Sequence, residues 1–111
     1  MISEGKKKQF DESQYEILIK CSGKGDLTQW NEWRENNQKV SILLEDANFI
    51  IANLKGAELI NTNLEGADLR NVNLTGAKLI AAIVDRQTFI WGCDFDKQTV
   101  FTGNELYLAK I

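Results

Sequence analysis

The sequence predicts an all-β solenoid, a chain wound into stacked coils around one apolar interior. The main observation is a leucine at every fifth position, at Leu54, Leu59, Leu64, Leu69, Leu74 and Leu79. On an α-helix, successive leucines would lie about 140° apart, so no single apolar face would form. On a flat strand, an odd spacing would send them alternately to opposite faces. A chain that turns a corner within every five residues brings all of them inward.

Two other positions of the repeat support the coil. Small residues stand two places before the leucines, at Ala52, Ala57, Thr62, Ala67, Val72 and Ala77, and each is followed by a polar residue. Two places after the leucines stand Gly56, Asn61, Gly66, Asn71 and Gly76. Glycine and asparagine most easily adopt positive φ angles, so they mark the corners. The pattern runs from Leu44 and Phe49 to Val84 and Phe89, which predicts ten inward centres within residues 41–90.

The stretches "ANLKGAELI" and "EGADLRNVNLTGAKL" resemble the pentapeptide-repeat family. The resemblance covers about half of the chain, and ten consecutive centres make it specific for a repeat solenoid. It implies a right-handed quadrilateral β-helix in which four repeats make one coil and residues about twenty apart stack. We therefore expect Leu54 to stack on Leu74 and Leu69 to stack on Phe89. The solenoid is short, about two and a half to three coils.

The residues before the solenoid predict a tail and a cap. Residues 1–9, with three consecutive lysines, are expected to form a flexible basic tail, and residues 10–40 a helical cap. Asp11 is a candidate N-cap with Gln14 three places on, and glycines at 23 and 25 end this first helix. Asp26 is a candidate cap for a second helix.

The second helix carries Trp30, Trp33 and Arg34 at helical spacing. One interpretation is that both tryptophans plug the N-terminal mouth of the coil. The other is an aromatic and arginine platform that binds a peptide or a base. We favour the plug, because apolar residues at helical spacing are normally packed.

After Phe89 we expect the register to break in "IWGCDFDKQTV", where Trp91, Cys93 and Phe95 predict a second cover. Residues 91–111 are assigned to a C-terminal cap and a terminal repeat edge. Phe101, Leu106 and Ile111 restore the five-residue spacing there, so they form a candidate dimer edge. The resemblance points the same way, since family members that dimerise often use their C-terminal ends. The alternatives are a monomer capped by "DFDKQTVF" and a solenoid that continues in a longer protein.

Composition argues against catalysis and against charged partners. The chain has no histidine, the usual general base and the commonest metal ligand, and its carboxylates are scattered over outward positions. We therefore expect no enzyme activity, cofactor or metal. Thirteen basic against sixteen acidic residues favour neither nucleic acid nor an anionic membrane. The sequence lacks a secretory signal and a long apolar run, and its two cysteines lie far apart, so we expect a cytoplasmic protein with free thiols.

These observations favour a protein–protein interaction or scaffold module, either free or as the N-terminal part of a longer protein. The alternative, which the resemblance implies, is a DNA mimic that regulates a type II topoisomerase. Six acids against four bases in residues 41–90, and a short solenoid, speak against it. Val40, Ile60 and Ile80 stand twenty places apart at outward positions and form a candidate interaction surface. An intramolecular cover from the N-terminal helices would explain the same residues.

Overall fold

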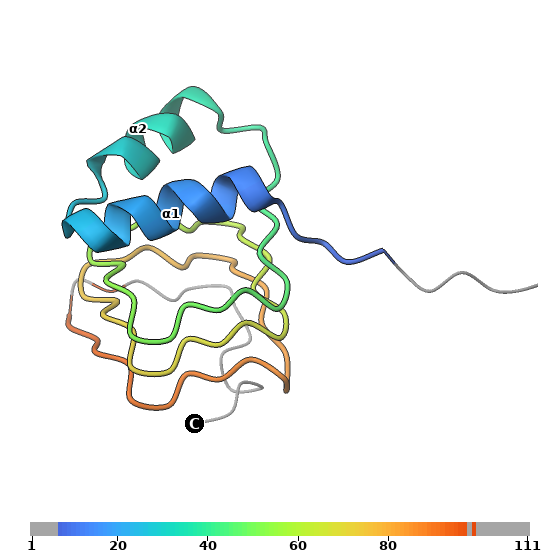
Figure 1. Ribbon diagram of the computed structural model, residues 1–111, viewed down its shortest axis with the longest axis vertical. Helices are drawn as coiled ribbons and strands as arrows, with labels where there is room; N and C mark the ends of the chain where they lie inside the picture. Colours follow the sequence, from blue (N-terminus) through green and yellow to red (C-terminus); the bar gives the residue numbers. More distant parts are fainter. Residues whose placement is uncertain (1–6, 98, 100–111) are drawn as a thin grey trace, which may run out of the picture.

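The computed structural model describes residues 7–97 and 99, and in it the chain winds beneath two N-terminal helices (Figure 1). Parallel bridges join residues twenty positions apart, at Leu43 and Asn63, Asn48 and Asp68, Asn53 and Asn73, Glu58 and Lys78, and Asn63 and Ile83. One bridge occurs every five residues, so each side of a coil pairs with the same side of the next. The coils therefore stack in the register that the repeats predict.

The sides of the coils are short, and the described residues contain isolated bridges instead of extended strands. At most of the described corners the reason is a left-handed residue, at Asp46, Ile51, Gly56, Asn61, Gly66, Asn71, Gly76, Ala81 and Gly92. A residue with positive φ redirects the backbone, so a ladder cannot continue past it. The coils thus pair through β-bridges, as expected for a β-solenoid. Within the described residues, the only regular secondary structure elements are the two helices.

The interior contains the five-residue leucines. Each has at most 3% of its surface exposed, and the small residues two places earlier are buried beside them. Leu54 lies in register with Leu74, since the amide of Leu54 donates to the carbonyl of Asn73 at 2.9 Å. The inward direction of these leucines is confirmed.

The register shifts by one residue in the corner at residues 85–88. Later bridges join Asp68 to Phe89 and Asn73 to Asp94, which are twenty-one positions apart. Phe89 therefore stands in the outward column of Asp68, and Ile90 packs against the core in its place. Our expectation that Phe89 stacks on Leu69 is wrong. Pairing also continues to Asp94, beyond the break that we expected after Phe89.

A local motif makes this longer corner. The hydroxyl of Thr88 donates to the carbonyl of Leu64 at 2.9 Å, and the carboxylate of Asp85 accepts from the amides of Gly66 and Gln87. The letters "DRQT" at residues 85–88 recur as "DKQT" eleven places later. The hydroxyl of Thr99 likewise donates to the carbonyl of Leu74 at 2.9 Å. Both corners thus replace a missing backbone partner with side-chain oxygens.

The cap consists of α1 (Glu12–Lys24) and α2 (Thr28–Asn36), which lie over the open end of the first coil (Figure 1). Asp11 caps α1 by accepting from the amide of Gln14, and Gly25 ends it with a φ of +69°. Asp26 accepts from the amide of Thr28 at the start of α2. The capping role of Asp11 is confirmed, whereas the N-cap of α2 is Leu27, which makes no side-chain cap bond, and Asp26 stands one residue before it.

Side chains of the cap satisfy the exposed backbone edge of the first coil. Gln14 bonds both the carbonyl of Ser41 and the amide of Leu43, each at 2.9 Å. Further bonds to the same edge come from Tyr15, Ser22, Trp30, Asn31 and Arg34. An edge covered in this way cannot template pairing with another chain.

The entry to the cap also contacts the first coil. Phe10 forms an antiparallel bridge with Leu44, and Lys8 makes an ion pair with Asp46 at 3.6 Å. Cys21 and Cys93 are free thiols. Neither helix of the described chain is long and apolar enough to cross a membrane.

Candidate functional site

One side of the solenoid combines exposed apolar side chains with a fixed ion pair. It consists of residues 47–51, 67–71 and 88–92, and we refer to it as the Trp91 face. Backbone bonds stack its layers, because the amide of Ile51 donates to the carbonyl of Arg70 and the amide of Asn71 to that of Trp91, both at 3.0 Å. Ile50, Arg70 and Trp91 therefore form one outward column, and Asn48, Asp68 and Phe89 form the other.

The outer layers of the Trp91 face are apolar apart from Asn48, which is exposed in the first layer. The exposed fractions are 38% for Ile50, 76% for Ile51 and 58% for Trp91. Ile51 also has a φ of +59°, a conformation in which a β-branched side chain is strained. The other described corners hold aspartate, asparagine, glycine or alanine. Ile51 thus carries both strain and exposure at a position where the repeat does not need isoleucine.

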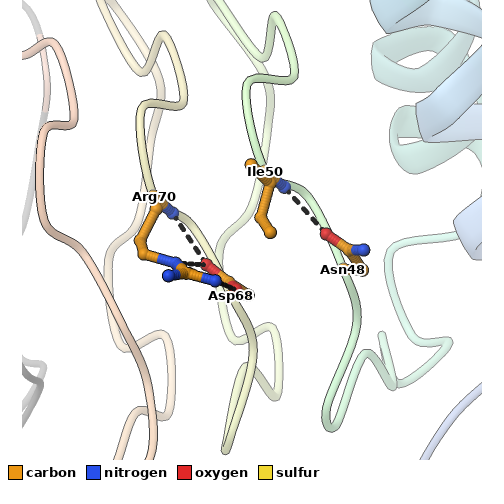
Figure 2. A network of polar contacts seen from close by, with 4 residues as sticks. All are labelled: Asn48, Ile50, Asp68 and Arg70. Atoms are coloured by element: carbon orange, nitrogen blue, oxygen red, sulfur yellow. Dashed lines mark hydrogen bonds and ion pairs between the residues drawn. The ribbon is translucent and has the colours of Figure 1, made fainter.

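The middle layer is charged. Arg70 donates two hydrogen bonds to the carboxylate of Asp68, from Nε to Oδ1 at 2.9 Å and from Nη2 to Oδ2 at 2.6 Å (Figure 2). This hydrogen bonding lowers the pKa of Asp68 and raises that of Arg70. The guanidinium carbon of Arg70 also lies 5.4 Å from the ring centre of Phe89, in cation–π contact. The ion pair is therefore held in place between two apolar layers.

The outward column of Asp68 has a second task, which sequence reasoning missed. The side chain of Asn48 accepts from the amide of Ile50, and that of Asp68 accepts from the amide of Arg70 in the same way (Figure 2). The same turn recurs along the chain at Asn53, Glu58, Asn63 and Asn73. The polar residue before each inward leucine is thus selected for corner formation as well as for contact with water. The recurrence of Asn and Asp at this position was the signal available.

Trp91, Cys93 and Phe95 were expected to crowd together as part of a C-terminal cover, and the outward position of Trp91 contradicts that for this residue. Phe95 is 43% exposed, and Trp91 is more exposed still. Cys93 is half-buried against the core, and its thiol donates to the carbonyl of Leu69 at 2.8 Å. Trp91 thus continues the coils instead of forming part of a cover.

The surface predicted from Val40, Ile60 and Ile80 lies on another side. Val40 is 44% exposed, while Ile60 and Ile80 are half-buried and stacked, since the amide of Asn61 donates to the carbonyl of Ile80. Arg34 of α2 donates to the carbonyl of Ile60 at 2.8 Å, so the cap reaches this side. These residues are not brought together with the Trp91 face.

A depression of about 510 Å³ lies beside α2 on that side, with Asn31, Arg34, Glu58, Ile60 and Lys78 among its lining residues. Arg34 is buried, and within the described chain its Nε has no hydrogen-bond partner. Two basic and two acidic side chains line the depression, so it has no dominant sign of charge.

The other predicted site residues fall into two groups. Trp30 is fully buried, donates to the carbonyl of Glu58 at 2.9 Å and stacks on the half-buried Trp33. Phe101, Leu106 and Ile111 lie outside the described residues. Among the residues that are described, no group of three or more Cys, Asp or Glu side chains is placed to hold a metal ion.

Comparisons with known proteins identify the repeats. Residues 47–84 match the family model for pentapeptide repeats in eight copies, and such repeats imply a right-handed β-helix. The crystal structure of a pentapeptide repeat protein (Rfr23) from the cyanobacterium Cyanothece 51142 is 48% identical over 51% of this chain, with a TM-score of 0.47. The match spans 38% of that protein's chain. The comparison with curated proteins gives no match.

Proposed function

We propose that this chain, a pentapeptide-repeat protein, is a non-enzymatic interaction module that binds a protein partner through the Trp91 face. Proteins with these repeats generally serve as non-enzymatic scaffolds. The short coils hold outward side chains at fixed positions, because corner amides donate to carbonyls of the next coil, as those of Asp46, Ile51 and Asn71 do. A rigid flat side presents its residues to a partner without an ordering cost.

The observation that carries the proposal is Ile51. A branched apolar side chain at φ +59° lowers the stability of the fold. Because the side chain is 76% exposed, burial does not offset this loss. Strain that the fold does not need is a reason to infer a function for the residue. Burial against a partner would remove the apolar surface from water.

The composition of the face supports the same function. Tryptophan and arginine are the residue types that most often dominate binding energy at protein interfaces. Here Trp91 and Arg70 lie in one column beside Ile50. Exposed apolar side chains that gather on one side of a small protein mark an interaction surface more often than scattered ones do.

Site-specific cross-linking tests the proposal. A photoreactive residue at position 51 is compared with one at position 55, on the neighbouring side, in extracts of the source cells. Cross-links to a discrete protein from position 51 alone are expected, and Ile51→Asn should weaken capture of the same protein by untreated bait. Equal cross-linking from both positions would contradict the proposal.

We do not extend the proposal to a DNA mimic of the kind that regulates type II topoisomerases. Acidic side chains do share one column on the neighbouring side, at Glu45, Glu65 and Asp85. The carboxylate of Asp85, however, is used by the corner, and adjacent Asp46 is paired with Lys8. The column therefore lacks the unbroken negative charge that mimicry of a duplex needs.

A further inference from the structure

We propose that a second copy of this chain occupies the Trp91 face, in a dimer whose two-fold axis runs parallel to the solenoid axis. This inference rests on the proposed function, because it names the partner. It follows from the order of charges and rings within the two outward columns. A two-fold interface must be complementary to itself, and few surfaces meet that condition.

The two columns flank the inward residues Phe49, Leu69 and Ile90, because successive side chains alternate between inside and outside. Rotation about an axis over that inward row exchanges the columns and keeps each layer at its own height. In the middle layer, Asp68 then lies opposite Arg70 of the second copy, and Arg70 opposite its Asp68.

The last layer also matches under this rotation. In the last layer, Phe89 lies opposite Trp91 of the second copy, and the pair recurs on the other side of the axis. In the first layer, Ile50 lies opposite Asn48 of the second copy, whose Oδ1 accepts from the amide of Ile50 in its own chain. Aromatic rings therefore meet aromatic rings, and each charge meets its opposite.

The alternative orientation is excluded by charge. A two-fold axis perpendicular to the solenoid axis would preserve the columns and invert the layers. Arg70 would then lie on Arg70 and Asp68 on Asp68 of the second copy, and like charges directly opposed across an interface are strongly unfavourable. The position of one ion pair thus selects one of the two face-to-face arrangements.

Arg70 and Asp68 in the middle layer are exposed enough to contact the second copy. Side-chain exposure is 45% for Arg70 and 20% for Asp68, so part of each group is open to a second partner. Four alternating charges would form a closed network between the aromatic layer and the layer of Ile50 and Asn48. A network of this kind stabilises more than isolated surface pairs do, because each charge has two partners.

Charge reversal tests the dimer. Arg70→Asp and Asp68→Arg each place like charges across the axis, and each should weaken association by about 100-fold or more. An equimolar mixture of the two variants restores opposite charges and should form a heterodimer. The double variant Asp68→Arg with Arg70→Asp keeps every pair and should dimerise with itself. Lys55→Glu on the neighbouring side, with the same change in charge as Arg70→Asp, is the control and should dimerise like the unchanged chain.

Light scattering over a concentration series and native mass spectrometry measure these states. A chain that stays monomeric at high micromolar concentration overturns the inference, and so does a dimer that survives Arg70→Asp. A dimer formed through the edge at Phe101, Leu106 and Ile111 would be insensitive to the charge reversals. It would therefore survive Arg70→Asp and overturn the inference. A monomer that still cross-links another protein from position 51 overturns the dimer and leaves the proposed function standing.

Discussion

At the residue scale, the φ angle of each corner decides which side chain is tolerated. Asp46, Asn61 and Asn71 have φ values of 58° to 59°, and their short polar side chains suit the left-handed region. Ile51 has the same backbone conformation with a β-branched side chain. The backbone register forces this conformation on residue 51, because its amide must reach the carbonyl of Arg70.

Ile51→Asn should therefore stabilise the fold by about 1 kcal/mol, since asparagine enters the left-handed region at lower cost. The melting temperature should rise by about 4–8 °C, as measured by circular dichroism. Asn61→Ile, at an exposed corner with φ 58°, is the matched reverse and should lose a similar amount. Equal melting temperatures for the unchanged chain and Ile51→Asn would show that this corner stores no strain.

Cys93 predicts an alkaline loss of stability. Burial raises the pKa of its thiol to about 11, whereas a cysteine in an unfolded chain ionises near pH 8.5. The folded state therefore keeps a proton that the unfolded state releases, so the contribution of Cys93 falls as pH rises from about 8.5 to 11. Cys93→Ala should be less stable at pH 7, and its deficit should narrow over that window in urea titrations. A constant deficit would argue that the pKa of the Cys93 thiol is the same in the folded and the unfolded chain.

At the element scale, one inserted residue changes which side chains face inward. The sequence pattern predicts Val84 and the preceding leucines correctly, because their spacing is strictly five. It fails at Phe89, since the longer corner at residues 85–88 moves Ile90 to the inward position. The repeated "D-x-Q-T" letters signalled the insertion, but only the bonds from Thr88 to Leu64 and from Asp85 to Gly66 explain them.

Thr88→Val tests the role of this corner. Its buried hydroxyl donates to the carbonyl of Leu64 and accepts from the amide of Asp85 at 3.2 Å, so the variant leaves that amide without this partner and should lose about 1–3 kcal/mol. Thr62 occupies the equivalent inward position of another repeat, two places before Leu64, and its buried hydroxyl has no partner in the described structure. Thr62→Val should be neutral or stabilising in the same denaturant titration. Equal losses in both variants would mean that the corner bond contributes nothing.

The cap makes a second prediction at this scale. Gln14 is 2% exposed and satisfies both a donor and an acceptor of the first coil. Gln14→Leu keeps the size of the side chain but leaves the carbonyl of Ser41 and the amide of Leu43 without this partner, so it should lose about 1–3 kcal/mol. Gln29→Leu, at an exposed position of α2, should change stability by less than about 0.5 kcal/mol. A loss below 1 kcal/mol for Gln14→Leu would indicate that water replaces the glutamine.

At the scale of the whole molecule, the interior could be predicted and the exterior could not. Residues at inward positions meet one requirement, which is to point toward a common axis. They therefore repeat every five residues. Residues at outward positions are selected for several roles, namely forming the corner turns, contacting the cap and contacting any partner. Their residue types therefore follow no single repeat. The stripe of Val40, Ile60 and Ile80 was visible as spacing, whereas the Trp91 face depends on the register shift at residues 85–88.

The cap and the solenoid share one core and should unfold together. Leu18 and Trp30 of the cap belong to the same buried cluster as the inward leucines, and Trp30 also bonds the carbonyl of Glu58. Repeat arrays lose stability when an end coil is uncovered, because each coil depends on its neighbour. Trp30→Ala should therefore lose about 3–5 kcal/mol, and it should lower hydrogen-exchange protection equally at the amides of Leu18 in α1 and Leu69 in the solenoid. Trp33→Ala, from the half-buried ring stacked on Trp30, should lose less. Loss of protection at Leu18 without loss at Leu69 would contradict cooperative unfolding of the cap and the solenoid. It would mean that the coils stay folded when the cap unfolds.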